Sequence, residues 1–456
     1  LGLAAGSAAT ATVVAVLWQV AGEGTIRYAL GGWPPGLGIA LQADALAALL
    51  LVMANLVALA ASAYATAYFT QASDREHFWP LWLLLWAALN ALFLAGDLFN
   101  IYVSLELMGL AAVALAALGG RRPALEAAQR YLVVGMLGSM AYLAGVTLIY
   151  GAYGTLDLTA AAALIGPGPA AWTAMVLMTA GLLLKAALFP LHFWLPPAHA
   201  NAPAPVSAAL SALVVKAAFY LVLRLWLDLF APVATLGASV LLGLLGAAAV
   251  LWGSWQALRA ERLKLMAAYS TVAQLGYLFL FFPLLVGLPP GPARDAAVGG
   301  AVVLALTHGF AKAALFLAAG VVQQRVGHDR IRDLGGTAQG LPVTTVAIAF
   351  AGIALIGLPP SGAFLGKWQL VSAAVVAGQW LWVPVVLAGS LLASAYVFRV
   401  LGYAFGSGPD VAHGLTGTRH EIPALVLAVL ATLVLGLGAA PLWPLLAGFG
   451  QGGSPL

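Results

Sequence analysis

The chain has 456 residues, of which 63% are hydrophobic and only 7% are charged, whereas an ordinary soluble domain carries roughly 25% charged residues. This composition identifies a membrane protein. Cysteine is absent, which excludes disulfides, Cys-ligated zinc and iron–sulfur clusters. The net charge of +4 is spread over short loops, without the basic stripe that nucleic-acid binding requires, so no nucleic-acid partner is expected.

Thirteen stretches reach the length of about 20 mostly apolar residues that a membrane-crossing helix needs. They cover residues 3–21, 41–70, 79–95, 98–118, 128–150, 170–199, 206–228, 233–257, 265–286, 297–324, 341–377, 381–404 and 422–447. The first stretch lacks the basic leader and cleavage site of a signal peptide. We therefore predict an all-α membrane protein with about 13 transmembrane helices, and because the chain starts without Met, we expect that a piece is missing.

The loops predict the orientation, because cytoplasmic loops carry the excess of Lys and Arg. The even-numbered loops hold Arg75, Arg121, Arg122, Arg259, Arg262, Lys264, Arg325, Arg330, Arg332 and Arg419. The opposite loops hold only Arg27 and Arg294. We expect a multi-pass protein of a bacterial or archaeal cell (inner) membrane, with its first residue cytoplasmic and its last residue outside.

Two predicted spans are too long and contain helix breakers. The span 170–199 contains Pro190, Pro196 and Pro197, and the span 341–377 contains the run GLPPSG from Gly357 to Gly362. Backbone that is irregular at membrane depth must line a cavity or be buried in protein. Two unrelated proline kinks are the plain alternative.

The two breaks fall in the sixth and eleventh spans, which predicts two five-helix repeats. An odd number of helices inverts the second repeat relative to the first, and paired broken helices mark ion sites in inverted-repeat transporters. The predicted units are N-terminal helices at 1–78, a first repeat and proton half-channel at 79–228, a second at 233–405, and a C-terminal helix at 406–456.

Five ionisable residues fall well inside the predicted spans. They are Glu106, Lys185, Lys216, Lys312 and Lys367. A charged side chain at the centre of a membrane helix costs about 2.5–3.5 kcal/mol on insertion scales, so these groups should face the bundle interior. Their similar depth predicts a lateral proton path at mid-membrane.

The chemistry requires groups that change their charge state. Desolvation disfavours a charged form, whereas a Glu–Lys pair favours both charged forms. Switching Lys185 between pairing with Glu106 and standing alone would therefore load and release a proton. The alternatives are a static salt bridge for this pair and, for Lys216, a side chain that extends to the membrane surface.

Histidines add to this row of ionisable residues at mid-membrane depth. His308 and Lys312 are four residues apart and share one helix face, which suits a relay, although a neighbouring backbone carbonyl could equally satisfy His308. His192, beside the first break, and His199 are secondary candidates, with an interfacial position as the alternative.

Other sites are not predicted. The seven histidines show no H-E-x-x-H or H-x-x-E-H spacing, and neither a G-x-G-x-x-G turn after a strand nor a Walker A loop occurs. We expect no metal and no bound cofactor. Arg224 and Asp228, four apart near a helix end, are interpreted as structural.

Several motifs resemble one known family. They are GDLFNIYVSLE at 96–106, KAALFPLHFWLP at 185–196, AHANAPAPVS at 198–207, YSTVAQLGY at 269–277, THGFAKAALF at 307–316, and GLPP at 357–360 with Phe364 and Lys367. This combination resembles the proton-conducting antiporter-like subunits shared by respiratory complex I, membrane-bound hydrogenases and Mrp-type cation/proton antiporters. The resemblance spans nearly the whole chain.

The resemblance implies usually fourteen helices, inverted five-helix repeats and both termini outside, so the family's first helix would be absent here. Glu106 is similar to the family's glutamate, Lys185 to its paired lysine at the first break, Lys216 to its central lysine and Lys367 to its residue at the second break. Some members carry glutamate at that last position. The run DLFN at 97–100 most resembles the D-type subunits of the Mrp antiporters.

Three functions remain open at this point. The leading hypothesis is a proton-translocating subunit of a multisubunit Na⁺/H⁺ antiporter, with other membrane subunits, protons, Na⁺ and lipid as its partners. The second is the proton-pumping membrane subunit of a complex I-like NADH–quinone oxidoreductase or a membrane-bound hydrogenase, which would make the chain part of an enzyme. The third is a non-conducting structural subunit.

Overall fold

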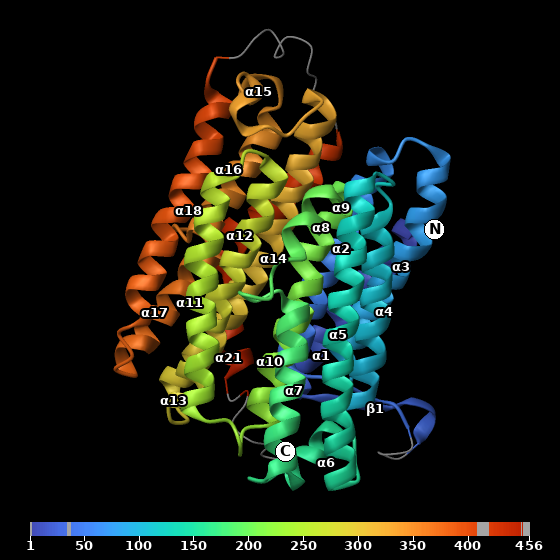
Figure 1. Cartoon of the computed structure of the whole chain (residues 1–456), viewed down its shortest axis with the longest axis vertical. Helices are drawn as coiled ribbons and strands as arrows, with labels where there is room; N and C mark the ends of the chain where they lie inside the picture. The colour runs from blue at the N-terminus through green and yellow to red at the C-terminus, as the bar shows by residue number, and fades with distance from the viewer. Residues whose placement is uncertain (1, 34–37, 408–418, 448, 450–456) are drawn as a thin grey trace.

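A computed structural model describes residues 2–33, 38–407, 419–447 and 449. Within these residues the chain is a bundle of helices with one small antiparallel sheet (Figure 1), in which β1 (Ile26–Ala29) pairs with β2 (Ala40–Ala43). The predicted all-α membrane class is confirmed. Part of the predicted C-terminal unit at 406–456 lies outside the described residues.

Eleven described helical segments are long and apolar enough to cross a membrane. They are α1 (Gly2–Glu23), α2 (Ala45–Tyr68), α3 (Ala72–Leu94), α4 (Leu98–Ala117), α5 (Arg122–Tyr153), α7 (Pro169–Ala186), the composite Ala204–Leu229, α11 (Leu236–Arg259), the composite Leu263–Gly287, α14 (Pro292–Val326) and α18 (Trp382–Phe405). The first composite contains α9 (Ala204–Ala209), the π-helix η2 (Leu210–Val214), α10 (Val215–Arg224) and the π-helix η3 (Leu225–Leu229). The second contains α12 (Leu263–Phe279) and α13 (Phe282–Gly287).

Shorter apolar helices supply two further crossings. One is made by α16 (Pro342–Ile356) with α17 (Gly362–Val376), and the other by α19 (Ile422–Val429), the π-helix η7 (Leu430–Val434) and α20 (Leu435–Gly438). The described crossings then number thirteen, as predicted. The connecting elements are η1 (Leu30–Gly32), α6 (Leu158–Leu164), α8 (Leu195–Asn201), η4 (Ile331–Asp333), α15 (Thr337–Gly340), η6 (Arg419–Glu421) and α21 (Leu442–Leu446).

Both predicted breaks are present. The first half of the sixth crossing, α7, ends at Ala186, and Ala187 adopts a left-handed conformation with φ 52° before α8 begins at Leu195. The first half of the eleventh crossing, α16, ends at Gly357 with φ 84°, and α17 starts after Ser361, whose hydroxyl accepts a hydrogen bond from the backbone N–H of Phe364 at 3.2 Å. In both crossings the chain thus leaves the helix and resumes it in a second one, which is tolerated at membrane depth only where the backbone is buried in protein or lines a cavity.

The order of the crossings accounts for the predicted inversion of the second five-helix repeat relative to the first. Five crossings from α3 to η3 are followed by five from α11 to α18, and the fourth of each five is the broken one. Because five is odd, α3 and α11 start from opposite ends of the bundle. The exact limits of the predicted units, 79–228 and 233–405, stay predictions.

The arginine-rich loops gather at one end of the bundle. Arg262 forms an ion pair with Asp329 at 2.9 Å and a backbone bridge with Arg330, so the loop before α12 meets the loop after α14. We call this the basic end. The opposite, acidic end carries the β1–β2 hairpin and the helix-capping residues Asp44 and Asp97.

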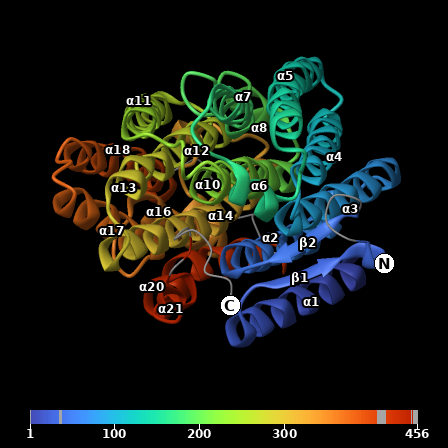
Figure 2. The ribbon, with the colours of Figure 1, turned by 90° about the horizontal axis from the view of Figure 1, so that it is seen from below.

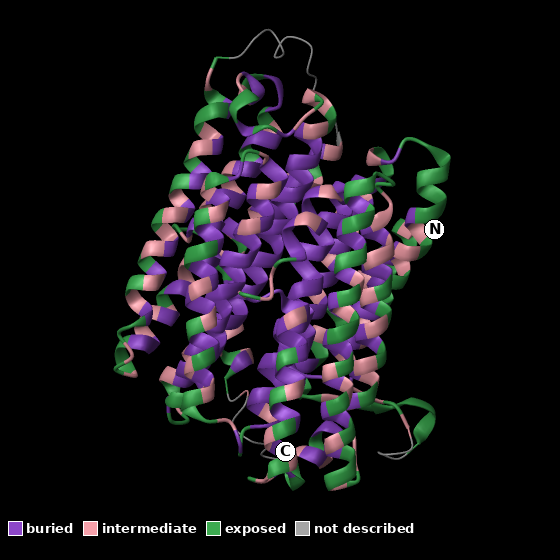
Figure 3. Ribbon diagram, viewed as in Figure 1, coloured by how far each residue is buried: buried purple, intermediate pink, exposed green. Residues whose placement is uncertain are grey.

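The most buried crossings lie at the centre of the bundle. The apolar windows of α14 and of Ala204–Leu229 are buried throughout, whereas α1 and α18 lie at the periphery, as Figures 2 and 3 show. Ionisable side chains on α10 and α14 are therefore surrounded by protein and not by lipid.

Candidate functional site

The lysines of this chain share one feature. All five lie in the interior, with side chains at most 6% exposed: Lys185, Lys216, Lys264, Lys312 and Lys367. The other 14 basic residues counted in Lys+Arg are arginines. An amine can lose its proton when burial penalises its charge, whereas a guanidinium stays charged. The interior therefore holds the cations that can exchange protons.

Glu106 and Lys185 form the ion pair that the sequence suggested. Lys185 Nζ lies 3.7 Å from Glu106 Oε1, with the lysine buried and the carboxylate side chain 25% exposed. Glu106 is on α4, and Lys185 is in the last turn of α7, directly before the break. A cation in that position is also favoured by the negative end of the helix dipole.

Close helix packing sets the position of Lys185. Gly138 on α5 and Gly181 on α7 face each other, so a Cβ built at Gly181 would meet the carbonyl oxygen of Gly138 at 2.3 Å. On the far side of the break, the Trp194 ring stacks on Tyr131 with centroids 4.2 Å apart, and its Nε1 donates to Leu184 O at 3.0 Å.

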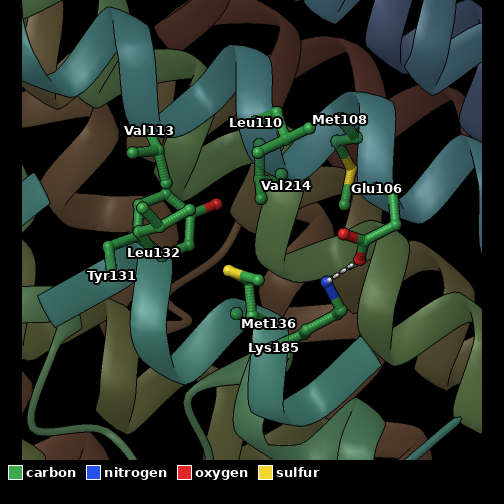
Figure 4. Close-up of a pocket in the computed structure, with 11 residues that line it drawn as sticks. Glu106, Met108, Leu110, Val113, Tyr131, Leu132, Met136, Lys185 and Val214 are labelled. Carbon is green, nitrogen blue, oxygen red and sulfur yellow. Dashed lines mark ion pairs between the residues drawn. The ribbon is translucent and has the colours of Figure 1, made fainter. Parts of the chain in front are cut away.

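A small pocket of about 20 Å³ lies beside this ion pair. It is lined by Glu106 and Lys185 together with Tyr131, Met136 and Val214 (Figure 4). Leu110 and Met136 at its rim are exposed on the outside of the bundle. The pocket therefore connects the pair with the lateral surface between α4 and α5.

Lys216 lies at the end of a π-helical segment. Its side chain is fully buried, and Nζ donates to Ser211 O at 2.5 Å. Ser211 belongs to η2, and its hydroxyl is 2.8 Å from that of Thr271 on α12. Single π turns are frequent at functional sites because they disturb the ordinary helical pairing of carbonyls.

Lys312 and His308 lie on the fully buried α14. Lys312 Nζ donates to Ser270 Oγ at 2.6 Å and to Ala267 O. Both ring nitrogens of His308 are buried without a hydrogen-bond partner among the described residues, which argues against a carbonyl that simply satisfies this histidine. Its neighbour Gly309 packs against η2, where a Cβ would meet Ala212 O at 3.4 Å, and its neighbour Thr307 packs against Gly362 at the second break. His308 therefore lies between the segment that holds Lys216 and the second break.

Lys367 occupies the second break. Its Nζ donates to Ile356 O at 2.9 Å and to Ser390 Oγ at 3.1 Å, and lies 4.1 Å from the centroid of the Tyr277 ring. Lys367 thus binds the free carbonyl end of α16. Lysines at both breaks therefore lie near the carbonyl end of a half-helix.

One face of α12 connects Lys312 with Lys367, and its role was missed from the sequence. Ser270 binds Lys312, Gln274 Nε2 donates to Leu355 O at 2.8 Å, and Tyr277 covers Lys367. These positions are four and three residues apart, the helical spacing that could have identified a polar stripe in the YSTVAQLGY motif.

The two secondary candidates, His192 and His199, lie in different surroundings. His192 is partly exposed in the first break and stacks on Phe189, with no lysine among its described partners. His199 is fully buried, and its ring stacks on Phe316, whose centroid lies 5.5 Å from Lys312 Nζ. The structure therefore places His199 close to the lysine on α14 and, within the described residues, shows no such contact for His192.

Lys264 is the buried lysine that the sequence windows assigned to a loop. It is the second residue of α12 and only 2% exposed. The apolar residues on both sides of it, Leu263 and Leu265, were the available signal, because they allow the span to start before residue 265.

The described residues contain no group of three or more His, Asp or Glu side chains placed to hold a metal ion. The groups that lie in the interior of the described bundle are instead one carboxylate, several amines and two buried imidazoles. Such groups can accept and release protons, with water bridging the longer separations.

A polytopic bundle with two broken crossings and a row of buried ionisable groups is typical of ion-translocating membrane subunits. The family described as NADH:quinone oxidoreductase/Mrp antiporter, transmembrane region, matches residues 95–393. The chain belongs to this family, and it is an antiporter-like membrane subunit.

Two relatives represent two kinds of assembly. The N subunit of the NADH-quinone oxidoreductase of Desulforudis audaxviator is 39% identical, over 91% of this chain and 84% of that protein. The D subunit of the Na⁺/H⁺ antiporter of Alkalihalophilus pseudofirmus is 28% identical, over 91% of this chain and 83% of that protein.

Solved structures agree over almost the whole length. A chain of the membrane-bound sulfane sulfur reductase, an archaeal respiratory membrane complex, superposes with a TM-score of 0.90 and 30% identity, covering 99% of this chain and 91% of that one. A chain of the Mrp complex from Dietzia sp. DQ12-45-1b gives 0.86 and 27%, covering 98% and 90%.

Proposed function

We propose that this chain translocates protons along a mid-membrane row formed by Glu106, Lys185, Lys216, His308, Lys312 and Lys367. The observation that carries the proposal is His308, whose two buried ring nitrogens have no partner among the described residues and which lies on α14 between Lys312, one helical turn away, and the second break. Buried polar groups are nearly always hydrogen-bonded. An unpartnered imidazole among amines suits a group that repeatedly accepts and releases a proton.

The protein works within a larger membrane assembly. The Glu106–Lys185 pocket opens on the lateral surface, and the solved relatives are chains of multisubunit complexes. The first candidate assembly is a cation/proton antiporter with Na⁺ as the exchanged ion. The second is a redox-driven proton pump, and the higher identity to a quinone oxidoreductase subunit than to an antiporter subunit favours it.

The test uses the assembly captured through a tag on this chain and reconstituted in liposomes with a pH-sensitive dye. We expect Glu106→Gln and Lys216→Met each to lower the rate of proton movement at least tenfold while the subunits still co-purify. The matched control removes the exposed pair of Arg122 and Glu126, whose side chains are 90% and 50% exposed, as Arg122→Gln with Glu126→Gln. Wild-type rates in both row variants would make the charged row structural.

The same liposomes separate the two candidate assemblies. Proton movement that follows an imposed Na⁺ gradient supports the antiporter. Proton movement that requires an electron donor and a quinone, and ignores Na⁺, supports the redox-driven pump.

A further inference from the structure

Lys264 is a buried cation that the proposed row does not use. It lies at the basic end, one residue into α12, with its side chain 2% exposed. Its Nζ donates to the carbonyl oxygen of Ala202, which ends α8, and its backbone N–H donates to Asp329 Oδ2 at 3.2 Å. Lys264 is therefore fixed between α8 and the basic-end loops.

His199, on α8, lies between Lys264 and the central lysines. The residue is fully buried, and neither ring nitrogen makes a hydrogen bond of full geometry within the described residues, although the backbone of Ser207 approaches the ring. Its ring stacks on Phe316 with centroids 5.3 Å apart, and Lys312 Nζ lies 5.5 Å from the centroid of that same Phe316 ring. Ser207 Oγ donates to His199 O at 2.8 Å and lies 3.3 Å from Ala202 O, the same oxygen that Lys264 binds. The short turn from His199 to Ala202 therefore links His199 with Lys264.

The basic-end surface is reached through Asp329. This carboxylate is buried, and its Oδ1 pairs with Arg262, whose side chain is 40% exposed. The sequence of contacts thus runs from an exposed arginine through Asp329 and Lys264 to His199. His199 in turn contacts the same Phe316 ring as Lys312.

We propose that Lys264 and His199 form the proton inlet from the basic end to Lys216 and Lys312, an inference that rests on the proposed proton translocation. The ammonium of Lys264 passes a proton to a ring nitrogen of His199 through bridging water, and the neutral amine that remains takes up a proton from solution. The imidazolium of His199 then passes its proton to the neutral amine of Lys216 or Lys312. Each transfer leaves its donor neutral and ready for the next proton.

The choice of lysine over arginine at position 264 distinguishes a proton inlet from a purely structural contact. Where the chain needs a permanent cation to bind carbonyl or carboxylate oxygens, it uses arginine, as at Arg224 with Asp44 and at Arg399 with Leu258 O and Ala260 O. A cation that only ties Ala202 O to α12 could be arginine as well. Lysine differs because it can give up its proton.

The experiment compares Lys264→Arg, Lys264→Met, His199→Gln and Lys216→Met in the reconstituted assembly, with the exposed Arg122→Gln and Glu126→Gln double variant as the control. Subunit yield and thermal unfolding temperature report structure, and dye-detected proton movement reports function. We expect Lys264→Arg to match the wild type in yield and unfolding temperature but to lower proton movement at least tenfold. His199→Gln should show the same separation.

Three results would be decisive against the inlet or its premise. Wild-type proton movement in Lys264→Arg, with only Lys264→Met failing to assemble, would make Lys264 structural. If neither Lys264 variant assembles, His199→Gln decides, because wild-type movement in that variant overturns the inlet. Wild-type movement in Lys216→Met would instead remove the proposed function itself.

Discussion

Lysine and arginine occupy different environments in this chain. The five lysines are buried next to carbonyls, hydroxyls or a single carboxylate, whereas the exposed loops use arginine. Arg224 shows how a buried cation is made permanent, because Asp44 and Asp228 both pair with it. Within the described residues, the lysines at the centre have no such carboxylates, so their charge depends on protonation.

Asp97 is an ionisable residue outside the membrane-spanning helices. Its Oδ1 accepts from the Asn100 N–H at 2.7 Å and begins α4, whereas its Oδ2 is buried without a partner. Burial, helped by the charge of Asp157 across an antiparallel bridge, raises the pKa of Asp97. Because the folded state then holds a proton more tightly than the unfolded state, the stability that depends on this group falls as pH rises above the ordinary Asp range.

Replacing Asp97 with Asn should therefore stabilise the protein at neutral pH. The amide oxygen keeps the helix cap, and the amide N–H₂ can donate to Asp157. We expect Asp97→Asn to unfold at a higher temperature than the wild type at pH 7, with the difference shrinking toward about pH 4, where the free carboxyl is half protonated. Thermal unfolding of the purified assembly measures this, with the exposed Asp74→Asn as the charge-loss control. A less stable Asn variant at pH 7 would contradict the prediction.

At the scale of elements, contact between α5 and α7 sets the depth of Lys185. Gly138 and Gly181 let the two helix backbones touch, and a Cβ built at Gly138 would also approach Lys185 Cγ at 3.3 Å. Forcing extra carbon into a tight contact typically costs about 1–3 kcal/mol. It would also move the last turn of α7, where Lys185 meets Glu106.

We expect Gly181→Ala to lower proton movement several-fold and to reduce the thermal stability of the assembly. The matched control is Gly151→Ala on α5, where a Cβ meets nothing within 4 Å and better helix propensity is worth up to about 1 kcal/mol. Equal behaviour of the two variants would show that the close contact does not position Lys185.

The sequence predicted the crossings and breaks because these depend on apolar length and on proline and glycine, which are local signals. It also predicted the Glu106–Lys185 pair, since one buried carboxylate has few possible partners. It missed the depth of Lys264, because an apolar window cannot show that protein covers a helix end. The α12 stripe of Ser270, Gln274 and Tyr277 was missed for a related reason, since only tertiary packing shows which lysine each residue meets.

At the scale of the whole molecule, we expect a neighbouring subunit to cover the pocket between α4 and α5. Glu106 is the ninth residue of α4, about 13 Å from its start at 1.5 Å per residue, so a short carboxylate side chain cannot reach the membrane surface. Its side chain is nevertheless 25% exposed, and a charge facing hydrocarbon is costly. A neighbouring subunit that brings a polar group to this surface would remove the cost.

A bulky residue at the pocket rim is therefore expected to weaken assembly. Leu110 is 51% exposed beside the pocket, and Leu241 on α11 is 57% exposed, so Leu241→Trp controls for the size of the new side chain. We expect Leu110→Trp to reduce at least threefold the amount of partner subunits recovered through a tag on this chain, and Leu241→Trp to leave recovery unchanged. Recovery equal to wild type in both variants would mean that no partner subunit covers the α4–α5 surface.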